Sequence, residues 1–237
     1  MTASGSPIPR TPRPRSTPPP DLAALRSALE AAFAGTGAGA PLLDLYARFA
    51  LLLLEENRKI NLTAIVEPAE VATKHFLDSW RAGTFLRLHG SRVLDLGTGG
   101  GFPGVPLAAG SPEAKFVLVD STRKKVEFLA RAMRELGLTN TRPEWGRGED
   151  LLRRERFDGV LVRAGGRLAS LLRLLAPVRR SFRWLGCMKG PRAEVELEEA
   201  GRAGLLRALP VETSHAYDLP GDAGMRRLLV FRGGAGG

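Results

Sequence analysis

The chain has 237 residues, of which 43% are hydrophobic, and its formal charge at pH 7 is +10. This length allows one sizeable domain with an attached subdomain, and no apolar run approaches a membrane span, so we expect no membrane partner. The single cysteine, Cys187, excludes a disulfide framework and a cysteine-ligated zinc site, which fits a cytoplasmic protein without a metal.

Residues 1–20 hold seven prolines and no cluster of large apolar residues. Proline lacks a backbone N–H and disfavours helix in the residue before it, so this segment is predicted to be a disordered tail. It contains Arg10, Arg13 and Arg15 and no acidic residue, but the rest of the chain is basic as well. Such a charge favours a polyanion as partner, either nucleic acid or an anionic membrane surface, although an arginine-rich composition alone can also produce it.

Residues 21–90 are predicted to form an N-terminal helical cap. Apolar residues recur every three or four positions over residues 22–33 and 42–52, which indicates two amphipathic helices. A third helix is expected to start near Pro68, because proline suits the first helical turn. It carries His75 and Asp78, which are three residues apart and therefore share one face.

Residues 91–237 alternate short β-rich runs with helices, which is typical of a doubly wound, mostly parallel sheet. The expected strands are "RVLDLG", "KFVLVD", a weak strand near Thr141–Trp145, "FDGVLVR" and "RWLGCMKG". A long helix is expected over Leu168–Phe182 and an acidic helix over Ala193–Ala200. Two late runs, near Pro210–Tyr217 and at "RRLLVF", predict a terminal hairpin that adds antiparallel strands to the sheet.

The stretch "VLDLGTGGGFPG" places five glycines and a proline within residues 97–104, directly after the first strand. Small residues there let a ligand approach the backbone at the carboxyl ends of parallel strands. A phosphate loop would need Gly-Lys-Ser/Thr, which is missing. The dinucleotide pattern is met by Gly99, Gly101 and Gly104, with Asp120 further on, but any glycine-rich run satisfies this pattern easily.

A third ligand class, S-adenosylmethionine, fits the register of the loop better. Asp95, Gly97, Gly99 and Gly101 match Asp/Glu-x-Gly-x-Gly-x-Gly with the acid at the strand end. A carboxylate suits a cofactor with positive amino and sulfonium groups and suits a pyrophosphate less well. Asp120, at the tip of the second strand, can accept hydrogen bonds from both ribose hydroxyls.

Six stretches resemble, in the same order, the small-subunit ribosomal RNA methyltransferase G family, also called glucose-inhibited division protein B. They cover roughly residues 40–232 and read "NLTAI", "KHFLDS", "VLDLGTGGGFPGVPLA", "LVDSTRKKVEFL", "FDGVLVRA" and "MKG". The Phe-Pro-Gly after the glycines and the Asp-Ser with two lysines after the second strand are far more specific than a glycine loop alone.

The resemblance implies a class I, Rossmann-like α/β fold with a seven-stranded sheet, antiparallel at one end, and S-adenosylmethionine as cofactor. It implies methyl transfer to N7 of guanine 527 in 16S ribosomal RNA, so that the partner is 16S rRNA or a small-subunit assembly particle. The implied cofactor contacts are Gly97, Phe102, Asp120, the Gly148–Glu149 pair and Arg163. The chain departs from the family pattern at Gly165-Gly166, where a bulky residue is usual, and at Arg226-Arg227, where Arg-His is usual.

Guanine N7 has a lone pair and no proton, so its methylation needs alignment rather than a general base, and the chain shows no obvious catalytic triad. The candidate substrate contacts are Arg163 at a strand end, Lys189 in "MKG", which is placed to hold an RNA phosphate, and His75 with Asp78. His75 can equally be a hydrogen-bonded structural residue where cap and sheet meet. Six arginines are candidate RNA contacts or simply solvated residues: Arg153, Arg154, Arg156, Arg179, Arg180 and Arg183.

Two other functions stay open beside an rRNA guanine-N7 methyltransferase. A methyltransferase of a small molecule or of protein would use the same glycine loop, and its basic charge would be incidental. A binding protein that associates with RNA would keep the fold but have a degenerate pocket. Binding of S-adenosylmethionine separates both enzymes from the binding protein.

Overall fold

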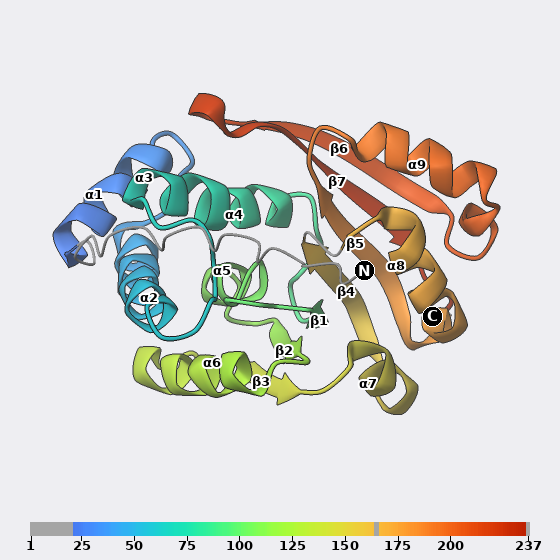
Figure 1. Cartoon of the computed structure of the whole chain (residues 1–237), viewed down its shortest axis with the longest axis horizontal. Coiled ribbons are helices and arrows are strands. Elements are labelled where there is room, and N and C mark those ends of the chain that lie inside the picture. The colour runs from blue at the N-terminus through green and yellow to red at the C-terminus, as the bar shows by residue number, and fades with distance from the viewer. Residues whose placement is uncertain (1–20, 164–165, 236–237) are drawn as a thin grey trace, which may run out of the picture.

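The computed structural model describes residues 21–163 and 166–235, so the predicted disordered tail at residues 1–20 lies outside the described residues. One seven-stranded sheet forms the centre, with helices on both of its faces and a group of helices at one side (Figure 1). Successive strand residues point to opposite faces: Val93 joins one apolar core and Leu94 joins the other. Because both faces of these strands are buried, their sequences are nearly continuous apolar runs.

The strand order is β3-β2-β1-β4-β5-β7-β6, and the strands from β3 to β5 in this order are parallel, whereas β7 runs antiparallel to β5 and β6. The strands are β1 (Arg92–Leu96), β2 (Lys115–Asp120), β3 (Thr141–Trp145), β4 (Phe157–Arg163), β5 (Phe182–Lys189), β6 (Val211–Leu219) and β7 (Gly224–Arg232). The predicted fold class, with its antiparallel end, is confirmed. The strands that follow β1 are added first on one side of it, as β2 and β3, and then on the other side, as β4 and β5. Ligands of such sheets bind at this switch point between β1 and β4.

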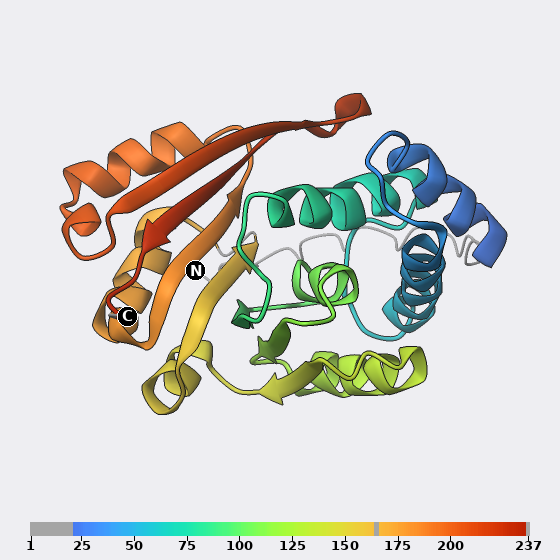
Figure 2. The same ribbon diagram turned by 180° about the vertical axis from the view of Figure 1, so that it is seen from behind.

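One helix follows each strand from β1 to β5, and these helices cover the sheet, as Figure 2 shows from behind. They are α5 (Gly104–Gly110), α6 (Arg123–Leu136), α7 (Gly148–Arg154), α8 (Leu168–Leu175) and α9 (Ala193–Arg202). The long helix predicted over residues 168–182 ends early, at Leu175, and continues as a 3₁₀ segment, Ala176–Ser181. Pro177 explains the change, because it has no N–H to donate within an α-helix.

The cap consists of α1 (Leu22–Ala32), α2 (Ala40–Asn57) and one continuous helical segment made of α3 (Pro68–Val71), a π-helical turn (Ala72–Leu77) and α4 (Asp78–Gly83). Aromatic side chains join it to the sheet: the rings of Phe49 and Phe76 lie 5.7 and 5.3 Å from that of Phe102, which follows β1. The Tyr46 hydroxyl donates to the carbonyl of Pro106 at 2.8 Å. Cap and sheet thus share one core, while the domain limits 21–90 and 91–237 stay a prediction.

Within residues 21–163 and 166–235, no helix combines the length and the apolar character that a membrane-spanning helix needs.

Candidate functional site

The glycine loop after β1 leaves open space in front of its backbone. The N–H groups of Gly97 and Thr98 both donate to the carbonyl of Val119 in β2, which fixes the start of the loop. Gly97 and Gly99 have φ values of 71° and 60°. In this left-handed region a residue with a side chain would be strained, whereas glycine is not. A Cβ added at Gly97 would meet no atom within 4 Å, and one at Gly99 would meet only the Gly97 carbonyl oxygen at 3.9 Å. The loop is therefore shaped to leave room for a ligand.

Asp95 lies beneath the loop and is completely buried. Its Oδ2 accepts hydrogen bonds from the Thr98 hydroxyl at 2.6 Å and from the N–H of Gly104 at 2.8 Å. Burial raises the pKa of Asp95 to about 6. A Cβ at Gly104 would stand 2.6 Å from Asp95 Oδ2, so only glycine allows this approach. Asp95 thus ties the glycine loop to the start of α5.

Asp120 joins the same loop to the end of β2. Its Oδ2 accepts from the N–H of Gly99 at 3.0 Å, and its Oδ1 accepts from the N–H of Thr122 at 2.8 Å. The residue is 8% exposed. Each carboxylate oxygen keeps a second lone pair for a ligand hydroxyl.

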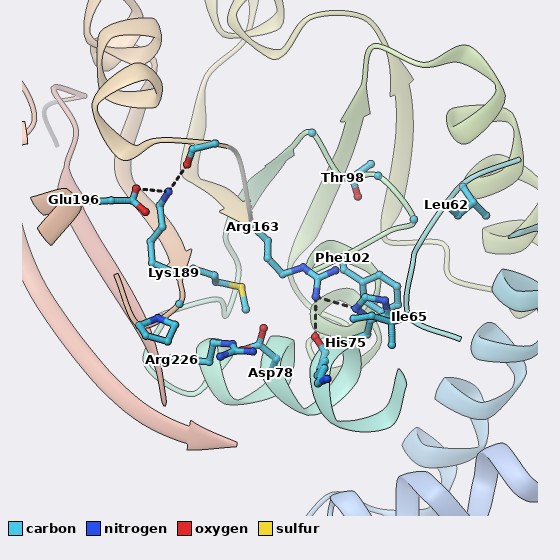
Figure 3. A pocket seen from close by; sticks show the side chains of 18 residues that line it. Leu62, Ile65, His75, Asp78, Thr98, Phe102, Arg163, Lys189, Glu196 and Arg226 are labelled. Atoms are coloured by element: carbon cyan, nitrogen blue, oxygen red, sulfur yellow. Dashed lines mark hydrogen bonds and ion pairs between the residues drawn. The ribbon is translucent and has the colours of Figure 1, made fainter. Parts of the chain in front are cut away.

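Arg163, the last residue of β4, reaches from the sheet to the cap (Figure 3). Its Nη1 donates to the Lys74 carbonyl at 2.9 Å and to His75 Nδ1 at 3.1 Å, and its Cζ lies 5.0 Å from the centre of the Phe102 ring. Burial lowers the pKa of Arg163, while the carboxylates of Asp78 and Asp95 oppose that shift. The guanidinium remains the cation at the centre of the site.

His75 is neutral and fully hydrogen bonded. Burial, followed by the nearby charge of Arg163, lowers its pKa to about 3. Arg163 can only donate, so His75 Nδ1 must accept, and the ring proton lies on Nε2, which is 2.8 Å from the Thr63 hydroxyl. The ring stacks on Phe102 at 4.5 Å between centres. His75 therefore positions Arg163 and the "NLT" segment and holds no proton for exchange.

Asp78 follows the π-helical turn and is buried at the wall of the site. The hydroxyl of Tyr217, from β6, donates to Asp78 Oδ1 at 2.8 Å. Among the described residues, no group donates to its other oxygen. Burial raises the pKa of Asp78, and the Tyr217 hydrogen bond opposes this shift. The carboxylate is thus held by one oxygen and can offer the other to a ligand.

Lys189, at the end of β5, is buried and already paired. Its Nζ donates to the Gly166 carbonyl at 2.7 Å and to Glu196 in α9 at 3.0 Å (Figure 3). Burial opposes ionisation of Glu196, but the N–H of Leu168 and the ammonium of Lys189 lower its pKa. Lys189 therefore holds the loop after β4, and its predicted contact with an RNA phosphate stays a prediction.

One pocket of about 600 Å³ joins these parts. The glycine loop forms one wall, the cap helix forms another, and the ends of β4, β5 and β7 complete it. The predicted site residues that line it are Gly97, Gly99, Phe102, Arg163, Lys189, His75 and Asp78. A pocket that reaches both the loop and the cap can hold two reactants side by side.

Comparisons with known proteins bear on this arrangement. The family model described as rRNA small subunit methyltransferase G matches residues 42–218. This chain belongs to that family. Ribosomal RNA small subunit methyltransferase G of Carboxydothermus hydrogenoformans is 39% identical over 194 residues, which cover 80% of this chain and 83% of the relative. The protein of that name from Deinococcus deserti is 43% identical over 198 residues, which cover 81% and 80%.

Solved structures support the fold alone. The tRNA methyltransferase TrmK of B. subtilis superposes with a TM-score of 0.52 at 13% identity, over 66% of this chain and 65% of that one. TrmN from Thermus thermophilus gives a TM-score of 0.51 at 18% identity, over 68% and 53%. The predicted Rossmann-like fold of class I methyltransferases is confirmed.

Five residues predicted to contact the cofactor lie outside the lining of this pocket: Asp95, Gly101, Asp120, Gly148 and Glu149. Asp95 and Gly101 are packed beneath the loop, and a Cβ at Gly101 would stand 2.8 Å from Val105. Gly148 starts α7 against Leu96, whose side chain a Cβ would overlap. The family's cofactor contacts at these positions stay a prediction for this chain.

The structure adds residues that the sequence did not indicate. Thr98 and Tyr217 hold the carboxylates of Asp95 and Asp78. Of the two departures from the family pattern, Gly166 and Arg226 line the pocket, and Gly165 lies outside the described residues. Arg227 points elsewhere, because it pairs with Glu194 at 2.6 Å. Within the described residues, no three His, Cys, Asp or Glu side chains lie close enough together to hold a metal ion.

Proposed function

We propose that this protein transfers a methyl group from S-adenosylmethionine to N7 of a guanine in 16S ribosomal RNA, with guanine 527 as the target. Family membership supports the reaction and the RNA substrate. The observation that carries the proposal is that one pocket places the open glycine loop opposite Asp78 and Arg163. Since ribosomal RNA is its substrate, we place its action in the cytoplasm.

The glycine loop fits S-adenosylmethionine. The backbone at Gly97 and Gly99 leaves free the space that a side chain would fill, and Asp120 has lone pairs left at the tip of β2. We assign Gly97, Gly99, Phe102 and Asp120 to holding it. When bound, S-adenosylmethionine supplies a methyl group that is electrophilic because it is attached to a positively charged sulfur.

The acceptor chemistry requires no general base in the pocket. Guanine N7 attacks with its own lone pair and has no proton to lose, so the chain need only position the ring. His75 agrees with this, because both of its nitrogens are hydrogen bonded and it is neutral. The reaction therefore depends on side chains that orient the base.

We assign the recognition of guanine to Asp78. Guanine alone among the RNA bases presents two adjacent donors, N1–H and the N2 amino group, on its Watson–Crick edge, and a carboxylate accepts both. N7 lies on the far side of the purine from that edge. A guanine held by Asp78 would thus turn N7 away from the cap and toward the glycine loop.

The test is a map of N7-methylguanine in 16S rRNA from cells with and without the gene. We expect the modification at guanine 527 to vanish without the gene and to return when it is restored. Calorimetry should show binding of S-adenosylmethionine and no binding of NADH. Unchanged methylation, or preference for NADH, would overturn the proposal.

A further inference from the structure

The positive charge of the protein is concentrated in one segment. Residues 139–183 contain eleven arginines and five acidic residues. Residues 21–138 hold fourteen basic and thirteen acidic residues, and residues 184–237 hold seven of each. Nearly all of the excess charge outside the N-terminal tail therefore belongs to the segment from β3 to the start of β5. A composition that was merely arginine-rich would spread the excess along the chain.

The fold gathers part of this segment around a second pocket. It measures about 430 Å³ and lies at the amino ends of β1, β4 and β5. Four arginines line it, with one acidic residue: Arg92, Arg156, Arg180, Arg183 and Asp158. In Figure 1 these strand ends lie on the side of α7, whereas the strands point toward α4 and the first pocket. We call this the arginine pocket.

Its arginines are held in place but only partly neutralised. Arg92 lies 4.4 Å above the Phe157 ring and pairs with Glu155, and Arg183 lies 3.6 Å from Asp158. Arg156 donates to the carbonyl of Arg180. Within the described part of the chain, neither Arg156 nor Arg180 has a carboxylate within 4.0 Å. The cluster therefore keeps guanidinium groups available for an anion.

Guanidinium groups suit phosphate because their planar N–H donors match its oxygens in pairs. Several of them around one concave surface match a ligand that carries several phosphates in a row. An RNA backbone is such a ligand, and its binding releases counterions, which makes attraction strong at modest salt. A single free phosphate would use only part of the cluster.

We propose that the arginine pocket binds the phosphodiester backbone of the substrate RNA, at a place separate from the methylation site. The proposal rests on the proposed function in that it takes RNA as the substrate. Arg163 ends β4 and Phe157 begins it, so the two places are roughly 20 Å apart along the strand. RNA that contacts both places must span at least this distance, so an RNA longer than a few base pairs is the substrate that gains from this contact.

The test removes three charges from the pocket with Arg156→Gln, Arg180→Gln and Arg183→Gln together. A matched control removes three exposed arginines elsewhere, with Arg87→Gln, Arg134→Gln and Arg207→Gln. Affinity for full-length 16S rRNA is measured by filter binding over a range of salt concentrations. We expect the pocket variant to bind about tenfold more weakly at physiological salt, with a salt slope lower by about two. The control should change affinity by less than about threefold.

Three further arms make the result specific. Replacement of the same three arginines by lysine should preserve the salt slope, because the charge is kept. An RNA hairpin around the target guanine that is too short to span the distance between the two pockets should bind the wild type, the pocket variant and the control equally, because it reaches only the first pocket. Affinity for S-adenosylmethionine, and circular dichroism, should match the wild type and so exclude misfolding.

Equal loss of affinity in the pocket variant and in the control would overturn the proposal, since net charge would then suffice. It would also be overturned if inorganic phosphate stabilised the wild type but not the pocket variant while both bound 16S rRNA equally. That result would assign the pocket to a small anion. Failure of the wild type to bind or methylate any RNA would overturn the proposed function, whereas normal methylation with an unaffected pocket variant would overturn only this inference.

Discussion

The two edges of the same sheet present charge in opposite ways. At the carboxyl edge, Arg163, Lys189 and Asp78 are each fixed by hydrogen bonds to named partners. At the amino edge, Arg156, Arg180 and Arg183 are exposed, and among the described residues only Arg183 has a carboxylate partner. The same residue types thus serve two purposes in one fold.

The difference teaches what each edge requires. Buried, hydrogen-bonded groups are oriented before a ligand arrives, so the carboxyl edge should respond sharply to the change of single atoms. Exposed charges act mainly through their sum and are weakened by salt, so the amino edge should tolerate single changes. Four substitutions at the carboxyl edge test this contrast.

The largest effect is expected for Gly99→Val. A branched side chain would strain the positive φ of Gly99 and fill space at the cofactor wall. We expect affinity for S-adenosylmethionine, measured by calorimetry, to fall about 100-fold, which corresponds to roughly 2.7 kcal/mol.

Gly90→Val is the matched control, because Gly90 has a φ of 67° and open space around it but lies in the turn before β1. It should cost similar stability and leave cofactor affinity unchanged. Equal binding by the Gly99→Val protein and the wild type would remove the glycine loop from the site.

Asp78→Asn should lower kcat/KM for methylation of guanine in 16S rRNA about 10- to 100-fold. The reason is that the amide NH2 group would face guanine N1–H or the N2 amino group and could not accept a hydrogen bond from it. Cofactor affinity should change little. Reconstituted RNA with inosine, which lacks the N2 amino group, sharpens the test: inosine should cost the wild type about tenfold and the variant much less. An equal cost of inosine in both proteins would refute recognition by Asp78.

His75→Gln should reveal the buried neutral imidazole through pH. The pKa of His75 is about 3 in the folded state and near 6.5 in the unfolded state, so the unfolded state binds more protons between these values. The stability advantage of the wild type over the variant should therefore be full above pH 6.5. It should shrink by about 1.4 kcal/mol per unit as pH falls toward 3.

Urea unfolding of both proteins at several pH values measures this difference in the free energy of unfolding. The titration of Asp95 contributes equally to both proteins and therefore cancels from the difference. A difference that stays constant with pH would mean that His75 has the same pKa in the folded and unfolded states, as an exposed imidazole would. His75 would then behave like the exposed arginines of the amino edge, and the contrast between the two edges would not hold for it.

Cys187→Ala should have the smallest effect. Cys187 lies on β5, two residues before Lys189, but it is completely buried, and burial raises the pKa of its thiol to about 12. We expect methyl transfer within about twofold of the wild type and a stability loss of about 1 kcal/mol. Loss of transfer by several orders of magnitude in a folded variant would instead indicate attack through a thiolate, as methylation of pyrimidine C5 requires.

The fold was predictable because its signals are local. Apolar runs of strand length mark β1, β2, β4, β5 and β7, whereas β3 at Thr141–Trp145 has only a weak signal. Gly137 ends α6 in the left-handed conformation, which glycine adopts without strain. The π-helical turn at Ala72–Leu77 was not predictable, since its widened geometry leaves no mark in the spacing of apolar residues. Pro177 did carry a signal for the early end of α8.

The candidate site was predictable in part. The glycine loop and Arg163 follow from their places at strand ends. The partner of Asp78 was not, because Tyr217 is 139 residues away in the chain and nothing in its own surroundings marks it. The burial of Asp95 also depends on packing, since a carboxylate at a strand end reads as a ligand group until the structure shows its hydrogen bonds.

The position of β7 between β5 and β6 has a consequence for synthesis of the chain. A ribosome completes β6 before β7, yet β6 touches the sheet only through β7. During translation, β1, β2, α5 and the glycine loop between β1 and α5 can thus fold early, whereas Tyr217 reaches Asp78 only after β7 has emerged. The side of the pocket to which we assign recognition of the base is therefore completed last, after the glycine loop to which we assign the cofactor.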